Sequence, residues 1–194
     1  MSSPPQVILL DSNVYFRLAR SIHPLLQGVF GNNPTYSLYV LSDLDDEYFT
    51  SSRLRTKFEW VKNREYRADR EGKQYSYEGR LRQPVENAFS FLAKYAREKE
   101  LSVSPEDLKA LAVGIARGIP VVSDDGDMRA VADAHDIECW NMVKFLKLLV
   151  TMGRIDMAKV TETLEYLDHE NDLPTSKGEL RRQFKEYFGI ACPI

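Results

Sequence analysis

Short blocks of apolar residues alternate along the chain with longer stretches of helical periodicity. Four blocks have the length and composition of strands, at residues 7–10, 36–41, 119–123 and 137–140. The first block, Val-Ile-Leu-Leu, contains no polar position, which is typical of a strand buried on both faces of a sheet. The pattern therefore predicts a sheet that is covered by other elements.

The segments between these blocks favour helices. Apolar side chains recur at helical spacing through residues 105–117, at Leu108, Leu111, Ala112, Ile115 and Ala116. Further helices are expected at residues 127–134, 141–152, 155–168 and 177–188. Residues 42–100 are mostly helical by composition, with breaks near Gly72 and Pro84. Strands that alternate with helices predict an α/β protein with a parallel sheet.

The length of the chain bounds its organisation. A sequence of 194 residues, 43% of them hydrophobic, is enough for one domain with a sizeable core plus an extension. We expect the main domain at residues 1–150, with the helical segment 51–99 inside it. Residues 151–194 are expected to form a C-terminal helical extension packed on the same domain.

Nothing in the sequence indicates a membrane or an oxidising environment. The apolar runs are far shorter than the roughly 18 residues that cross a bilayer, and the first six residues lack the features of a signal peptide. The two cysteines, Cys139 and Cys192, are too few for a disulfide framework, and Cys139 is expected to be a buried thiol. A cytoplasmic protein without membrane contact is the expectation.

Charge is distributed unevenly along the chain. The sequence has 26 Lys and Arg against 29 Asp and Glu, a net charge of −3, which argues against a protein that coats nucleic acid by bulk charge. Residues 53–82, however, hold ten basic and five acidic residues, a local charge of +5, with aromatic residues among them. This segment is either a solvated helical face with internal ion pairs or a surface for unpaired nucleic acid. The candidate contacts are Arg53, Arg55, Lys57, Lys62, Arg64 and Arg67.

Acidic residues from distant parts of the chain are expected to meet at one edge of the sheet. Asp11 directly follows the first strand, and the acidic loop 124–127 follows the third. Asp107 lies in the first turn of the helix that leads back to the third strand, and Glu47 lies in the helix that follows the second. Because the crevice of an open parallel sheet lies at the carboxyl ends of its strands, topology brings these carboxylates together.

Clustered carboxylates repel one another unless a cation neutralises them. A site of Asp and Glu, with His23, His135 and His169 scattered elsewhere, favours Mg²⁺ or Mn²⁺ over zinc. Such a cation keeps open positions for phosphate oxygens and for an attacking water. The sequence thus predicts phosphodiester hydrolysis, with single strands as the favoured substrate because duplex-reading motifs are absent.

Two parts of the sequence resemble the PIN domain, the nuclease family that includes VapC-like toxins. Residues 7–14, Val-Ile-Leu-Leu-Asp-Ser-Asn-Val, are similar to its opening strand and first acidic motif, and Glu47 fits its second acidic position. Residues 104–108 and 117–128 resemble its third and fourth acidic motifs. The likeness covers residues 5–50 and 100–145, is weak across 51–99, and leaves residues 146–194 unmatched.

The resemblance implies both a fold and an activity. The fold is a three-layer α/β/α arrangement with a parallel sheet of four to five strands, and the activity is Mg²⁺- or Mn²⁺-dependent cleavage of RNA. The catalytic metal ligands would be Asp11, Glu47, Asp107 and Asp125, with Asp127 beside them. Asn13, Ser123 and Asp124 would support these ligands. The implied partners are single-stranded RNA, a protein antitoxin and a second copy of the chain.

Other interpretations of the same residues stay open. Each carboxylate is also a plausible helix cap, Asp107 above all, because Ser104 and Pro105 precede it. In the segment 43–47 the acidic neighbours of Glu47 compete with it for the second position. The chain could therefore be a non-catalytic nucleic-acid-binding protein on a PIN-like scaffold. A phosphatase with Asp11 as nucleophile is a further alternative, although Asn13 replaces the second aspartate that such enzymes carry.

Overall fold

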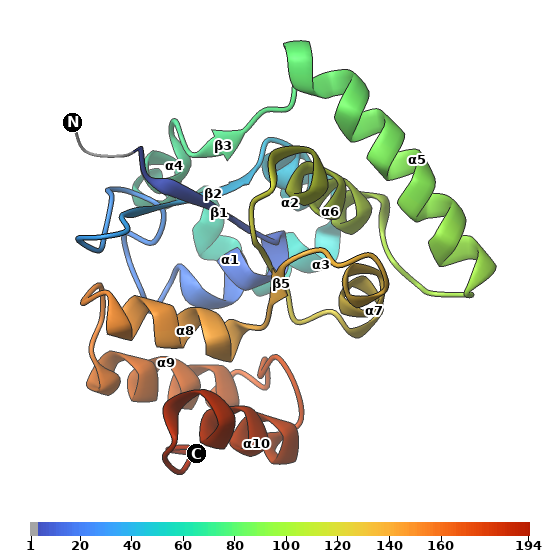
Figure 1. Ribbon diagram of the computed structural model, residues 1–194. Helices are drawn as coiled ribbons and strands as arrows, with labels where there is room; N and C mark the ends of the chain where they lie inside the picture. The colour runs from blue at the N-terminus through green and yellow to red at the C-terminus, as the bar shows by residue number, and fades with distance from the viewer. Residues whose placement is uncertain (1–3) are drawn as a thin grey trace.

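The computed structural model describes residues 4–194 as a three-layer α/β fold, which confirms the expected fold class (Figure 1). Its central sheet has five parallel strands in the order β3-β2-β1-β4-β5. The strands are β1 (Gln6–Leu10), β2 (Tyr36–Leu41), β3 (Gln74–Tyr75), β4 (Val121–Val122) and β5 (Cys139–Trp140). The strand order reverses direction between β1 and β4, and ligand crevices of such sheets form at this point.

The side chains of β1 and β4 alternate between the two faces of the sheet, as the pleat requires. Ile8 and Leu10 enter the core on one face, and Leu9 enters the core on the other. Val122 enters the same core as Leu10, and Val121 enters the same core as Leu9. The two strands pair with Leu10 opposite Val122. All of these side chains are at most 1% exposed, so the centre of the sheet is rigidly packed.

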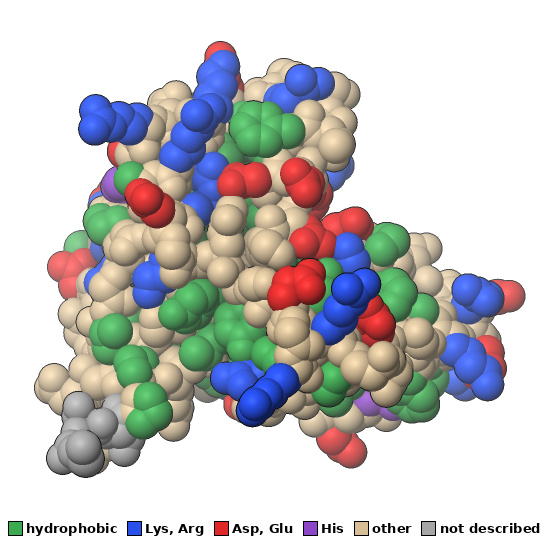
Figure 2. Space-filling view, turned by 90° about the horizontal axis from the view of Figure 1, so that it is seen from above, with side chains coloured by type: hydrophobic (Ala, Val, Ile, Leu, Met, Phe, Trp, Pro, Cys, Tyr) green, Lys and Arg blue, Asp and Glu red, His purple; other side chains and the backbone are tan. Residues whose placement is uncertain are grey.

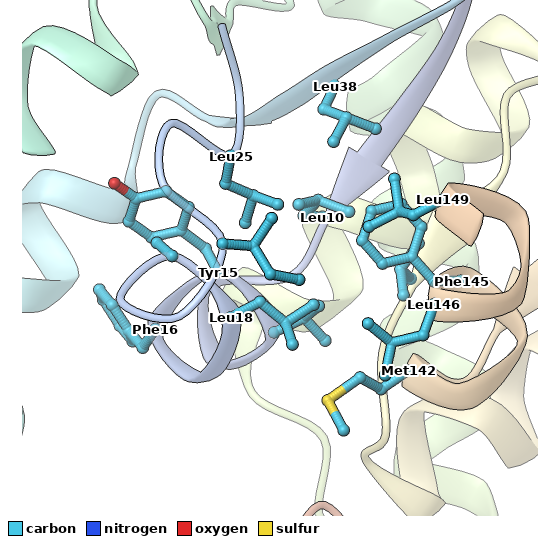
Figure 3. Packing of buried hydrophobic residues seen from close by; sticks show 14 of the residues in the cluster. Leu10, Tyr15, Phe16, Leu18, Leu25, Leu38, Met142, Phe145, Leu146 and Leu149 are labelled. Atoms are coloured by element: carbon cyan, nitrogen blue, oxygen red, sulfur yellow. The ribbon is translucent and has the colours of Figure 1, made fainter. Parts of the chain in front are cut away.

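Helices α1 (Ser12–Leu18) and α8 (Met142–Thr151) cover the first face, and Figure 3 shows their side chains meeting over β1 and β2. Helices α9 (Met157–His169) and α10 (Lys177–Phe188) follow α8 and lie below it in Figure 1. Leu164 and Phe184 from these two helices belong to the same apolar cluster as Ile8. Residues 151–194 thus enlarge the core of this face.

The opposite face is covered by α5 (Arg82–Glu98), α6 (Pro105–Arg117) and α7 (Gly126–Ala134). Gly114 lets α6 approach the sheet closely, because a Cβ at this position would lie 2.9 Å from a side-chain carbon of Val121. The helix ends at Gly118, whose φ of 62° suits glycine. The expected limits of this helix, 105–117, are those observed.

The segment between β2 and α5 is a chain of short elements. They are α2 (Leu44–Thr50), α3 (Ser52–Lys57), η1 (Glu59–Lys62), α4 (Arg64–Arg70) and η2 (Gly79–Leu81). Strand β3 also lies here, at the sheet edge, in a stretch that composition alone had indicated as mostly helical. A strand of two residues is too short to show the period of two on which sequence prediction depends.

Two charged residues of this segment are buried and hold it in place. The Asp69 carboxylate accepts hydrogen bonds from the backbone N–H groups of residues 25–27, at 2.9 to 3.2 Å. The Arg70 guanidinium pairs with Asp45 at 3.0 Å and donates to the Tyr15 hydroxyl at 3.2 Å. The segment is therefore tied to the core through specific polar contacts as well as through apolar packing.

Within residues 4–194 no helix is both long and apolar enough to cross a membrane. The expectation of no signal peptide rests in part on residues 1–3, which lie outside the described residues.

Candidate metal centre

Asp11 lies at the carboxyl end of β1, where the strand order reverses. Its side chain is 7% exposed, and one carboxylate oxygen accepts a hydrogen bond from the Ser123 hydroxyl at 3.1 Å. The Ser123 oxygen in turn accepts the backbone N–H of Asp125 at 3.2 Å. Ser123 therefore links the ends of β1 and β4 and fixes the orientation of Asp11, consistent with the supporting role expected for it.

The acidic residues that follow β2 have separate roles. Asp43 pairs with Lys109 at 2.7 Å, and Asp45 pairs with Arg70. Asp46 is exposed, whereas Glu47 is half-buried. Glu47 and Asp11 line the same small hollow, so Glu47 lies near the end of β1. This arrangement favours Glu47 over its neighbours as the second acidic position.

Asp107 combines a structural role with its place in the acidic group. As the third residue of α6 it forms a capping box with Ser104: the Ser104 oxygen accepts the Asp107 N–H at 3.1 Å, and the Asp107 carboxylate accepts the Ser104 N–H at 3.3 Å. The cap uses one carboxylate oxygen and leaves the other available. Capping and membership of the acidic site are thus compatible.

The electrostatics show that these side chains are neighbours. Burial, followed by the charge of Asp107, raises the pKa of Asp11 to about 7 from its ordinary value of 3.8. Burial also raises the pKa of Glu47 and of Asp107, and the charge of Asp107 adds to the effect on Glu47. For Asp107 the charge of Asp125 raises the pKa further, against the opposing hydrogen bonds from Ser104. Carboxylates from four separate elements therefore repel one another at this edge.

The other acidic residues of the loop after β4 are engaged in hydrogen bonds. Asp125 is exposed and caps α7 by accepting the N–H of Met128 at 2.7 Å. Asp127 accepts the N–H of Ser102 at 2.8 Å, and Asp124 accepts the N–H of Met142 at 3.0 Å. The second oxygen of Asp124 is buried without a partner. Whether Asp125 or Asp127 binds a cation stays a prediction.

A cleft of about 740 Å³ opens beside these carboxylates. Its lining includes Asn13 together with the acidic residues Asp43, Asp46, Glu47, Glu106 and Asp107. Two cations, Arg53 and Lys109, line the same cleft. Figure 2 shows acidic side chains gathered near the middle of one face, with Lys and Arg side chains beside them.

Sequence reasoning identified Arg53 but missed Lys109. Lys109 follows Asp107 by two positions on α6, and its Nζ lies 2.7 Å from an Asp43 oxygen. A search for basic residues in the turns that carry the acidic motifs would have found it. The remaining basic candidates lie outside the cleft: Arg55, Arg64 and Arg67 are exposed, Lys57 pairs with Asp172 and Lys62 pairs with Glu59.

The donor chemistry of the edge fits a hard divalent cation, because every candidate ligand is a carboxylate. In the part of the chain that the structure describes, no three Asp, Glu, His or Cys side chains already stand in a geometry that could hold a metal ion. Rotamer changes of half-buried or exposed side chains such as Glu47 and Asp125 would be needed to close a coordination shell. Among the described residues the edge is thus an acidic cluster without a completed coordination shell.

Two solved structures resemble this chain. FitAcB from Neisseria gonorrhoeae is 14% identical, with a TM-score of 0.44 over 69% of this chain and 96% of that chain. VapBC-5 from Mycobacterium tuberculosis, described as a member of the VapBC family of toxin–antitoxin systems, is 17% identical, with a TM-score of 0.44 over 71% of this chain and 100% of that chain. No protein-family model and no curated protein matches the sequence. Conclusions about function therefore rest on the residues of the acidic cluster itself.

Proposed function

We propose that the acidic edge binds Mg²⁺ or Mn²⁺ and hydrolyses phosphodiester bonds of single-stranded RNA. The observation that carries this proposal is the convergence of Asp11, Glu47 and Asp107, whose pKa values are all raised, next to a cleft that also presents cations. A protein gains nothing in stability from burying carboxylates together without a counter-charge. Such an arrangement is typical of a functional site.

Each side chain has a distinct role in this proposal. Asp11, Glu47, Asp107 and Asp125 would hold the cation, with Asp127 as a further candidate, and Ser123 keeps Asp11 in position. A bound cation supplies a Lewis acid for the phosphate and lowers the pKa of a water. Arg53 and Lys109 would attract the phosphates of the strand into an otherwise acidic cleft.

Cleavage of a labelled single-stranded RNA tests the proposal, with single-stranded DNA of the same sequence beside it. Purified protein is assayed in Mn²⁺, in Mg²⁺ and in excess chelator, together with Asp11→Asn and, as a matched control, Glu165→Gln on the exposed face of α9. We expect cleavage that chelator and Asp11→Asn abolish and that Glu165→Gln leaves unchanged. Equal cleavage by Asp11→Asn would contradict the proposal.

A non-catalytic nucleic-acid-binding protein is the second candidate function. It is favoured by the hydrogen bonds in which Asp107, Asp125 and Asp127 satisfy backbone N–H groups, since these bonds give each carboxylate a structural role that needs no cation. This alternative predicts RNA binding of equal strength in Mg²⁺ and in chelator, and no cleavage in either. The nuclease proposal predicts that Mg²⁺ strengthens RNA binding by the wild-type protein. Asp11→Asn is left out of this comparison, because it lacks a proposed ligand of the cation.

The sequence resemblance also predicts a toxin role, with an antitoxin that covers the acidic cleft. Expression of the wild-type chain alone would then arrest growth, whereas Asp11→Asn would not. Growth that is unaffected by an active enzyme would point to RNA processing or defence. A homodimer is likewise a prediction, and sedimentation of the purified chain measures it directly.

A further inference from the structure

A second groove lies at the other end of α3 from the acidic cleft. Its volume is about 540 Å³, and its lining is aromatic and polar. The residues that matter for its chemistry are Arg20, Lys57, Lys62, Trp60, Asn63 and Tyr66. None of these residues lines the acidic cleft, so the groove is a separate feature of the surface.

The aromatic side chains of this groove pack against neighbouring aromatic rings. The Trp60 ring contacts Tyr66 with 4.4 Å between ring centroids, and it meets Phe58 edge-on at 6.3 Å. Tyr66 is also supported by His23, whose ring lies edge-on at 4.7 Å. Trp60 is half-buried, packs against the core and lines the groove, so part of the residue is accessible there. A rigid aromatic face is what a flat ligand needs for stacking.

The groove also supplies positive charge at its rim. Lys62 lies 3.0 Å from Glu59, and both side chains are more than half exposed, so this pair is weak and can be exchanged for a phosphate. Lys57 pairs with Asp172 at 2.7 Å, and Arg20 donates to the Tyr166 hydroxyl at 3.1 Å. Three cations against Glu59 and Glu65 leave the lining with a net positive charge.

The two hollows are joined by α3. Ser51, Arg53 and Leu54 line the acidic cleft, and Thr56 and Lys57 line the second groove. A helix of six residues is about 9 Å long, so a strand that leaves the cleft reaches the groove within a few nucleotides.

We propose that this groove binds an unpaired nucleobase of the strand held in the acidic cleft, with the base stacked on Trp60 and a flanking phosphate at Lys62. The inference rests on the proposed function for the nature of the ligand, but it concerns binding and is tested without cleavage. An aromatic face bordered by cations is sequence-tolerant, because every base has a π-face. The groove would thus favour single strands over duplexes, whose bases are covered by stacking.

The fluorescence of Trp60 reports directly on such stacking. The chain has two tryptophans, so Trp140→Phe leaves Trp60 as the only one. This variant is titrated in excess chelator with a short oligouridylate and with an abasic oligonucleotide of the same length. We expect oligouridylate to quench Trp60 saturably and the abasic strand to leave its emission unchanged. Equal effects of both strands, or no quenching by oligouridylate, would overturn the inference.

Substitution separates this site from the proposed catalytic edge. Trp60→Leu is expected to weaken oligouridylate binding by about 5- to 150-fold, the range for one base–aromatic stack. Phe91→Leu removes an aromatic side chain of α5 that is 57% exposed and is the matched control, with unchanged binding expected. Quenching without any cleavage would leave the groove assigned and refute the nuclease. Cleavage without quenching would support the nuclease proposal and refute base stacking in the groove.

Discussion

Replacing Asp11 with asparagine is expected to stabilise the metal-free protein at neutral pH. The folded state holds this carboxyl in a buried position beside Asp107, and its pKa is raised from 3.8 to about 7. Well below pH 3.8 the group is protonated in both the folded and the unfolded state, so it does not affect the free energy of unfolding. As the pH rises toward 7 the unfolded chain loses this proton more readily than the folded one, so the free energy of unfolding falls.

The size of the effect follows from the pKa. A shift of about three pKa units corresponds to about 4 kcal/mol at full ionisation, since one unit is worth about 1.36 kcal/mol. Integration between about pH 5 and pH 8 gives a loss of about 3 kcal/mol for the wild type. Asparagine does not titrate, and its side-chain oxygen still accepts the hydrogen bond from Ser123. The Asp11→Asn variant should therefore escape this loss.

Urea unfolding in excess chelator, at about pH 5 and about pH 8, measures the effect for wild type, Asp11→Asn and the control Glu165→Gln. The advantage of Asp11→Asn should grow by about 3 kcal/mol between the two conditions, whereas Glu165→Gln should follow the wild type. Mn²⁺ at pH 8 should then stabilise the wild type more than Asp11→Asn, because it neutralises the repulsion. An advantage that does not change with pH would refute the reasoning.

Three further predictions concern stability and reactivity. Asp69→Ala should destabilise the protein by about 3 kcal/mol or more in urea unfolding, because it leaves the buried N–H groups of Leu25 and Leu26, and the part-buried N–H of Gln27, without an acceptor. A loss below about 1 kcal/mol would argue against that anchor. Ser104→Ala should lower the melting temperature by the equivalent of about 1 kcal/mol through loss of the capping box, and an unchanged melting temperature would contradict this. Burial raises the pKa of the Cys139 thiol to about 12, so a thiol reagent at neutral pH should modify Cys192 well before Cys139. Mass spectrometry of partly modified protein decides this order, and preferential labelling of Cys139 would refute it.

The acidic edge was predictable because it depends on topology. The carboxyl ends of parallel strands share one edge, so the positions of Asp11 and of the loop 124–127 followed from the strands alone. The helix 105–117 was equally clear, since Ser104, Pro105 and Gly118 are strong local signals for its two ends.

Other features depend on contacts that no local pattern encodes. Strand β3 exists because Gln74 and Tyr75 pair with β2, and two residues carry no periodicity of their own. Lys109 reaches the cleft through its ion pair with Asp43, 66 positions away. Arg70 belongs to the basic segment in sequence, yet it is 3% exposed and serves as an internal anchor. Charge along a sequence does not reveal which charges face solvent.

Calorimetric titration of the RNA-free protein with Mn²⁺ at about pH 8 is the most direct test of the acidic edge as a metal centre. The account predicts saturable binding by the wild type and by Glu165→Gln, and a loss of at least about tenfold in affinity for Asp11→Asn, a change of about 1.4 kcal/mol. Absence of binding by the wild type, or equal binding by Asp11→Asn, would contradict it.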